Sequence, residues 1–464
     1  MKKLFTAFIA TCSVLSAFGA EPNDSYTLEA CQQLALHNNR SLQNARLEER
    51  MADEDISIAF TNYFPSVSAN ATGFIGAADL MRATMDLTSI GQTYGPMLMQ
   101  AGFGELLMGM PPQMDVAMIK KGAMANIMAM QPIFAGGQIV NGNRLAALQK
   151  EVRHLQIRMD EKNVMQNVAD YYWQIVALRS NLTTLDAVDE QLAAIHALTE
   201  NYINAGIITR NDLLTVELKQ QEVASTRLQL NNGLELLRLV LAQLCGADSN
   251  NFTVTSPASI EAPQAPATYF VPPTEAVYNR EELELAGKNV EVKALQVRME
   301  RGKNMPSVAI GAAGLYQGID MGKMSVKNGG MMYNMNIGNL VGLATVSIPI
   351  SDWWGGKHAI RKARLEQTKA ENERLDALEM LQIDIISSWN NLTEAYGQIE
   401  IARKSVTAST ENLRINREQY AAGTLPMSDL LDAVTLFTRA NSDLNSALAT
   451  YQNRVSEYQR KVGT

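Results

Sequence analysis

The sequence has few cysteines and histidines and no long hydrophobic run. Three of its 464 residues are Cys and four are His. The His residues are scattered, and no His-Glu-x-x-His, Gly-x-Ser-x-Gly or phosphate-loop motif is present. Neither an enzyme active site, a metal site nor a cofactor is therefore predicted. A net charge of −8 argues against nucleic acid as a partner.

The N-terminus has the pattern of a secretory signal peptide at residues 1–20. Lys2 and Lys3 precede a short apolar segment, and small residues allow cleavage after Gly19 or Ala20. Downstream, no segment has the ~18 consecutive apolar residues of a membrane-spanning helix, so a membrane crossing would have to use strands.

Removal of the signal peptide leaves two cysteines, Cys31 and Cys245. An exported protein can form a disulfide. The alternative, which we favour from the sequence, is two buried thiols that pack as small hydrophobic residues.

Helix and strand periodicities alternate along the first half. Apolar residues recur at helix spacing from Leu28 to Tyr63, and the period changes to two after Pro65. The predicted elements are strands at about 65–76 and 123–134, a long coiled-coil helix at about 137–205 and a return helix at about 210–245. Between the strands, residues 77–122 read as an irregular loop rich in Met. Its thioethers could bind Cu(I), but we favour flexible apolar packing.

The second half repeats this order. Gly206 and Gly423 each precede an Asp-Leu-Leu by six residues, and they are 217 positions apart, as are Gly246 and Gly463. The predicted units are a first repeat at 21–246, a linker at 247–273 and a second repeat at 274–464. The second repeat should contain strands at about 306–316 and 342–351, a Gly- and Met-rich loop between them, a long helix at about 355–421 and a return helix at about 428–462.

Four short, half-apolar strands in one chain constrain the fold class. An open sheet edge in lipid leaves backbone N–H and C=O groups unpaired, so membrane strands must close into a barrel, and the smallest barrels have about eight strands. Several chains would therefore share one barrel, with apolar faces toward lipid and Ser, Thr and Asn toward a watery lumen. The prediction is a mixed α and β membrane protein. Trp353 and Trp354, between strand and helix, fit either an interfacial aromatic belt or core packing.

The order of elements and several motifs resemble the TolC family of outer-membrane efflux channels. The matching residues are Asn38-Asn39 and Asn279-Arg280, Pro65, Pro132, Pro306 and Pro349, Gly136-Gly137 and Gly355-Gly356, and the two Gly-x5-Asp-Leu-Leu turns. The resemblance implies a homotrimer in the outer membrane, with a twelve-stranded barrel and a helical tunnel in the periplasm. It also implies docking to a periplasmic adaptor and an inner-membrane transporter.

The resemblance also implies roles for residues at the periplasmic tip. They are Gly206 and Gly423 as the tip turns, Asp429 and Asp432 as lumen acids, and Asp212, Asn211 and Tyr420 as gate contacts. The family pattern has Arg where this chain has Leu425, so fewer charged gate contacts are expected. The competing interpretation is that the Asp residues only favour the helix dipole in a first turn.

The predicted function is a passive exit channel of a tripartite efflux pump, which conducts drugs or other small molecules. The alternatives are an outer channel for type I protein secretion or for heavy metals (Cu or Ag), or a periplasmic coiled-coil structural protein without a pore. The alternating segments after Pro65 and Pro306 favour a channel, because a structural coiled coil needs no lipid-facing strands.

Overall fold

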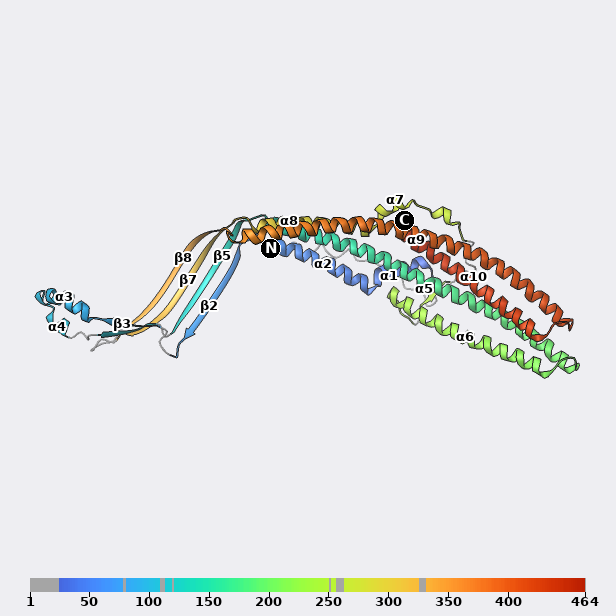
Figure 1. The fold of residues 1–464 in the computed structure, drawn as a ribbon. Helices are drawn as coiled ribbons and strands as arrows, with labels where there is room; N and C mark the ends of the chain where they lie inside the picture. The colour runs from blue at the N-terminus through green and yellow to red at the C-terminus, as the bar shows by residue number, and fades with distance from the viewer. Residues whose placement is uncertain are drawn as a thin grey trace, which may run out of the picture. The chain divides into compact units, whose positions relative to one another are not determined.

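The computed structural model describes residues 25–77, 81–108, 113–118, 121–249, 252–255, 263–324 and 331–463, so the predicted signal peptide lies outside the description. The chain forms two compact units (Figure 1). The helical unit contains the chain up to Ala52 together with Gln149–Val290 and Lys369–Thr464. The sheet unit contains Asp53–Leu148 and Glu291–Thr368.

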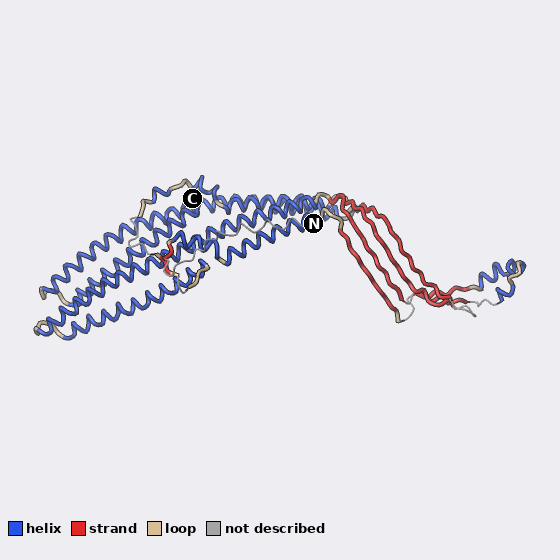
Figure 2. The backbone as a smooth tube through the Cα atoms, turned by 180° about the vertical axis from the view of Figure 1, so that it is seen from behind, coloured by secondary structure: helices blue, strands red, loops and turns tan. Residues whose placement is uncertain are grey.

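Helices make up most of the chain, and most of the strands belong to one sheet (Figure 2). The helices are α1 (Leu28–Asn38), α2 (Arg40–Thr61), α3 (Thr88–Gln100), α4 (Gly104–Met108), α5 (Gln138–Asn204), α6 (Arg210–Cys245), α7 (Pro273–Ala276), α8 (Glu281–Lys303), α9 (Asp352–Ala421) and α10 (Met427–Val462), with 3₁₀ helices η1 (Pro266–Tyr269) and η2 (Val277–Asn279). The strands are β1 (Ser25–Tyr26), β2 (Ser66–Ile75), β3 (Met81–Asp86), β4 (Gln113–Met118), β5 (Lys121–Ala135), β6 (Thr253–Val254), β7 (Ser307–Met324) and β8 (Met331–Ser347).

The sheet has more strands than predicted, and two of its strands are longer than predicted. Strands β2, β5, β7 and β8 are neighbours in that order, all antiparallel. The predictions of an irregular loop at 77–122 and of a Gly- and Met-rich loop after 316 are wrong for most of these residues. β3 and β4 pair with each other, and β7 and β8 continue to Met324 and Met331. Unbranched Met and Gly give no alternating apolar pattern, but their backbones pair as well as any others.

One face of the four-stranded sheet is apolar through its middle. Directly paired residues share a face, and the register brings apolar residues of all four strands together. They are Val67, Ala69 and Ala71 of β2, Ala125, Ile127 and Ala129 of β5, Val308, Ile310, Ala312 and Tyr316 of β7, and Leu340, Ala344 and Val346 of β8. This face is uncovered within the chain, since Val67 is 69% exposed and Leu340 79%.

The opposite face is only partly polar. On β2 it carries Ser66, Ser68 and Asn70, and the Asn70 amide donates to the Asn126 side chain of β5 at 3.2 Å. On β8 the same face carries Val341 and Leu343. The prediction of a polar face therefore holds for β2 and is incomplete for β8.

The long helices follow the predicted heptad rhythm. Buried residues of α9 occur in alternating steps of three and four: Ile385, Ser388, Leu392, Ala395, Ile399, Ala402, then Ser409 and Leu413. Leu185, Val188, Leu192 and Ile195 of α5 follow the same rhythm. Helices α5, α6, α9 and α10 lie side by side in both Figure 1 and Figure 2. In the described part of the chain, no helix is long and apolar enough to cross a membrane.

The two repeats end in the same way. Gly246 and Gly463 follow α6 and α10 with φ of 61° and 81°. A Cβ on Gly246 would lie 2.6 Å from the Asn38 Cβ, and one on Gly463 would lie 2.8 Å from the Asn279 Cβ. Each terminal Gly therefore makes a close approach to the Asn of its own repeat, which only a residue without a Cβ permits.

The first helical stretch is interrupted, although the sequence predicted one helix from Leu28 to Tyr63. Asn39 separates α1 from α2 with extended backbone geometry. Its side-chain oxygen accepts hydrogen bonds from the Ser41 and Leu42 N–H groups at 2.9 and 3.4 Å. Asn is a preferred N-cap residue, so the local cap stabilises a helix start inside an otherwise helical pattern.

Candidate gate at the helical tip

The two tip turns have the same backbone hydrogen bonds. In the first, Gly206 N–H donates to Ile203 O and Ile207 N–H donates to Tyr202 O, both at 2.9 Å. In the second, Gly423 N–H donates to Tyr420 O at 2.9 Å and Thr424 N–H donates to Gln419 O at 3.0 Å. Both Gly residues have positive φ, 69° and 72°, as in a Schellman helix end.

Tyrosines join α5 to α9 beside these turns. The Tyr202 hydroxyl donates to Ala421 O at 2.7 Å, and the Tyr420 hydroxyl lies 3.4 Å from the Thr199 hydroxyl. The two tyrosine rings are 6.1 Å apart, centroid to centroid. Tyr420 is 4% exposed. Burial raises the pKa of Tyr420; the Thr199 hydrogen bond opposes this rise, and the negative charge of Asp212 adds to it.

Asp212 and Asn211 lie at the start of α6. One Asp212 carboxylate oxygen accepts from the Thr209 N–H at 3.2 Å and from the Thr209 hydroxyl at 3.1 Å. Asp212 therefore bonds to Thr209, the N-cap residue of its own helix, and not to Tyr420. The Tyr420 hydroxyl lies beside the Thr199 hydroxyl. Asn211 is exposed, and its carbonyl accepts from the Thr215 hydroxyl at 2.9 Å. Sequence reasoning missed Thr199 and Tyr202, although Tyr202 stands four residues before Gly206.

Asp429 and Asp432 are exposed on the first turns of α10. Their spacing puts both carboxylates on one face of the helix, opposite buried Leu430 and Val434. The Ser428 hydroxyl donates to Asp429 at 3.1 Å. Leu425 packs, half-buried, against the apolar cluster that contains Leu430 and Tyr420. An apolar contact therefore occupies the position where the resemblance led us to expect a charge.

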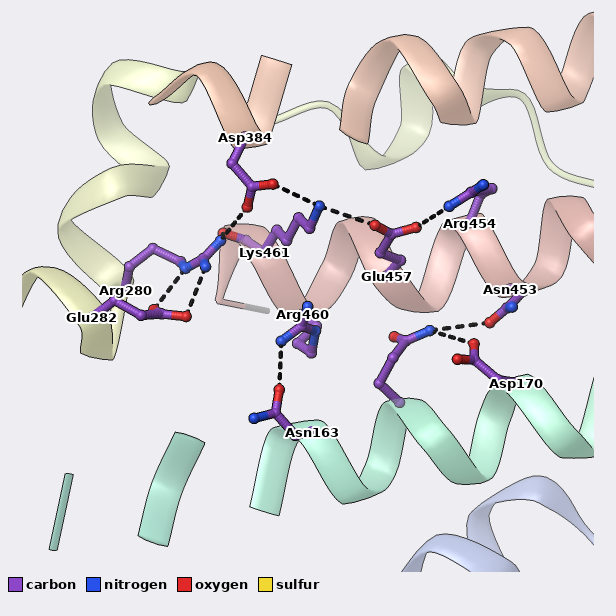
Figure 3. Close-up of polar contacts among 11 residues, drawn as sticks. Asn163, Asp170, Arg280, Glu282, Asp384, Asn453, Arg454, Glu457, Arg460 and Lys461 are labelled. Carbon is purple, nitrogen blue, oxygen red and sulfur yellow. Dashed lines mark hydrogen bonds and ion pairs between the residues drawn. The ribbon is translucent and has the colours of Figure 1, made fainter. Parts of the chain in front are cut away.

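A second polar cluster in the helical unit centres on Arg280 (Figure 3). Its guanidinium binds Glu282 through two hydrogen bonds of 2.8 and 2.9 Å and pairs with Asp384 at 3.3 Å. Lys461 lies 2.9 Å from both Asp384 and Glu457. Burial alone would lower the pKa of Arg280, but the bonds to Glu282 and Asp384 raise it overall. The cluster fixes the start of α8 against α9 and α10.

The neighbouring Glu281 is 3% exposed and receives two cations from α5. Arg158 and Lys162 each lie 2.8 Å from its carboxylate oxygens. Burial would raise the pKa of Glu281, but the Lys162 hydrogen bond and both positive charges lower it overall. The sequence indicated this region only through the Asn279-Arg280 motif.

A cleft of about 740 Å³ runs between α5 and α10 in the same unit. Both polar and apolar side chains line it. The Gln166 amide donates to Asp170 at 2.8 Å and to Asn453 at 3.0 Å (Figure 3). Among the described residues, no group of three or more His, Cys, Asp and Glu could hold a metal ion.

Trp354 is 86% exposed, so the interpretation of this residue as core packing is wrong.

Comparison with known proteins identifies the class. The family model described as outer membrane efflux protein matches residues 32–247 and 273–463. TolC of Escherichia coli strain K12 is 22% identical over 335 residues, which cover 69% of this chain and 66% of TolC. BepC, an outer membrane efflux protein of Brucella suis biovar 1, is 22% identical over 435 residues, or 91% of this chain and 79% of BepC. The chain thus spans just under two thirds of TolC.

Solved structures have the same fold. The outer-membrane channel OprN matches with a TM-score of 0.72 and 16% identity, over 94% of this chain and 89% of OprN. The Campylobacter jejuni CmeC outer membrane channel matches with a TM-score of 0.70 and 16% identity, over 94% of this chain and 85% of CmeC. The chain belongs to the outer membrane efflux protein family. It is an outer-membrane protein that extends into the periplasm, with the fold of the TolC-like channels, and its family is one of transport proteins.

Proposed function

We propose that this protein is the outer-membrane exit channel of a tripartite efflux pump. Three copies share one barrel and one helical tunnel, and a periplasmic adaptor connects them to an inner-membrane transporter. The channel conducts drugs or other small molecules passively and catalyses no reaction. Substrate choice belongs to the transporter, because a water-filled duct needs no specific binding pocket.

The observation that carries this proposal is the uncovered apolar face of the sheet. Val67, Ile127, Ile310, Leu340 and Val346 on that face are all exposed in the single chain. Such a face is unstable in water and fits lipid. A coiled-coil structural protein without a pore would not need an uncovered apolar sheet face.

The sheet edges support assembly from several copies. Within the described residues, β2 pairs with β5 alone and β8 pairs with β7 alone, so each keeps one open edge. Open edges are not tolerated in lipid. Pairing β2 of one copy with β8 of the next removes both of these open edges when three copies close a ring.

The acids at the tip fit a cation-selective constriction. Asp429 and Asp432 are exposed on α10, and a threefold axis would bring three copies of each together. Converging carboxylates favour cations over anions. The proposed roles of Asp212, Asn211 and Tyr420 are to hold the turns in the closed arrangement.

Two matched variants test the membrane assignment. Leu340→Lys places a charge on the apolar face and should cost about 2–4 kcal/mol at the bilayer midplane, which should reduce the trimer recovered from outer membranes. Asn70→Lys lies on the other face and should be tolerated. Recovery of the unmodified protein as a soluble periplasmic monomer would overturn the proposal.

A deletion strain separates the candidate cargoes. Loss of the gene should increase susceptibility to small toxic compounds. Accumulation of an unsecreted protein substrate, or hypersensitivity to Cu or Ag salts alone, would instead assign the channel to type I secretion or to metal efflux.

A further inference from the structure

The two cysteines of the mature chain lie together where the first repeat begins and ends. Cys31 is in α1 and Cys245 is the last residue of α6, and both are 0% exposed. The Cys245 thiol donates to the Cys31 carbonyl oxygen at 3.4 Å. A hydrogen bond between the two side chains, with burial, raises the pKa of the Cys31 thiol. The Cys245 sulfur therefore lies against the backbone of Cys31, and the two thiols are unbonded in this structure.

The cellular compartment favours oxidation of such a pair. The third cysteine, Cys12, falls in the predicted signal peptide, and the family is one of the outer membrane. The helical unit of an outer-membrane protein of this family faces the periplasm, where disulfides form and persist. A pair of adjacent thiols in that compartment has no competing cysteine in the mature chain.

The second repeat shows what the cysteine pair would replace. Asn39 donates to Leu244 O at 3.1 Å, and Arg280, in the equivalent position, donates to Lys461 O at 3.4 Å. Arg280 adds ion pairs with Glu282 and Asp384 that fasten the second repeat. Asn39 has no charge with which to make such pairs, and its partner Leu244 directly precedes Cys245.

We propose that Cys31 and Cys245 form a disulfide in the exported protein, which links α1 covalently to the end of α6. The bond would form by exchange with a disulfide-bearing oxidant of the periplasm. One thiolate attacks a sulfur of the oxidant, and the first oxidant thiolate leaves. The second cysteine thiolate then attacks the mixed disulfide, and the other oxidant thiolate leaves. The two cysteines lose two electrons and two protons, and the oxidant becomes a dithiol.

Burial sets the time at which the bond can form. No oxidant reaches a sulfur that is fully covered, and the raised pKa of Cys31 leaves little of its reactive thiolate. The exchange must therefore occur during folding, before α1 packs on α6. Once formed, the bond should resist reductants in the folded state for the same reason.

Peptide mapping of the full-length protein tests the proposal directly. Outer membranes are isolated and denatured with N-ethylmaleimide present, so that buried free thiols also react, and the protein is digested without reductant. The expected product is a peptide that links Cys31 to Cys245, two hydrogens lighter than the two thiol peptides combined. Recovery of both cysteines mainly as N-ethylmaleimide adducts would overturn the proposal, whether or not the protein conducts ions.

A double variant provides an independent readout. Cys31→Ala with Cys245→Ala keeps small buried residues and removes the bond. Unfolding and refolding with a phosphine reductant should lower the midpoint of thermal unfolding of the unmodified protein by several degrees and leave the double variant unchanged. An equal response of both proteins to the reductant would contradict a disulfide.

Discussion

The hydroxyl of Tyr202 offers a direct test of the proposed gate at the tip. It donates to the Ala421 carbonyl at 2.7 Å and so joins α5 to the end of α9. We expect opening of the proposed gate to move α9 away from α5 and to break this bond. Tyr202→Phe removes the hydroxyl and keeps the ring beside Tyr420, so it should favour the open state.

The magnitude follows from the exposure of the contact and from the proposed symmetry. Ala421 is exposed, so water can replace the lost donor, and the cost is about 0.5–1 kcal/mol per chain. Three identical contacts that break together give about 1.5–3 kcal/mol, or roughly a 10- to 100-fold shift toward the open state.

Single-channel recording in planar bilayers measures this shift as an increase in open probability. Tyr172→Phe is the matched control, because the Tyr172 hydroxyl donates to Thr255 O at a similar 2.8 Å, far along the chain from either tip turn. It should lower the stability without changing the open probability. Equal open probability in Tyr202→Phe and the unmodified protein would refute the reasoning.

Three further predictions concern the tip acids, a helix end and a buried carboxylate. Replacing both Asp429 and Asp432 with Asn should lower the cation preference in bilayer recordings, and unchanged selectivity would reduce them to helix caps. Gly463 has a φ of 81° and lies against Asn279, so Gly463→Ala should destabilise the protein by about 1–3 kcal/mol in thermal unfolding. Gly397 lies in an open helix position, so the control variant Gly397→Ala should stabilise the protein by about 0.5–1 kcal/mol. Because the folded pKa of Glu281 is lowered, its stabilisation is present above the ordinary value of 4.5 and is lost as the pH falls through the folded pKa. Glu281→Gln should therefore cost about 1–3 kcal/mol at pH 7, and the difference from the unmodified protein should shrink in acid; a constant difference would contradict the ion pairs.

The sequence was sufficient for the long helices and for the existence of the four strands β2, β5, β7 and β8, but not for the short helices and strands between β2 and β5. The heptad spacing of apolar residues such as Ile385, Leu392 and Ile399 predicts their burial, because one face of the helix packs against neighbouring helices along its length. Strand length could not be read in the same way. The ends of β7 and β8 are rich in Met and Gly, which show no period of two, and their pairing is fixed by the opposite strand.

Individual side-chain partners were harder to predict than elements. The sequence placed Asp212 and Tyr420 near the same turn, but hydrogen-bond geometry assigns Asp212 to Thr209 and Tyr420 to Thr199. Local caps compete with long-range contacts for the same carboxylate, and spacing alone does not decide between them. The Cys31–Cys245 contact was also undecidable, because it depends on how α1 meets α6.

Leu425 makes the stability of the tip contact depend on temperature rather than on salt concentration. A latch made of charges weakens as salt is added, since ions screen it. A leucine packed among Leu430 and Tyr420 is indifferent to salt, and its contribution fades on cooling because apolar burial is entropy-driven near room temperature. If the tip acts as the proposed gate, leakage through it should vary with the temperature of the medium more than with its ionic strength, so the permeability of the cell surface would follow temperature rather than salt.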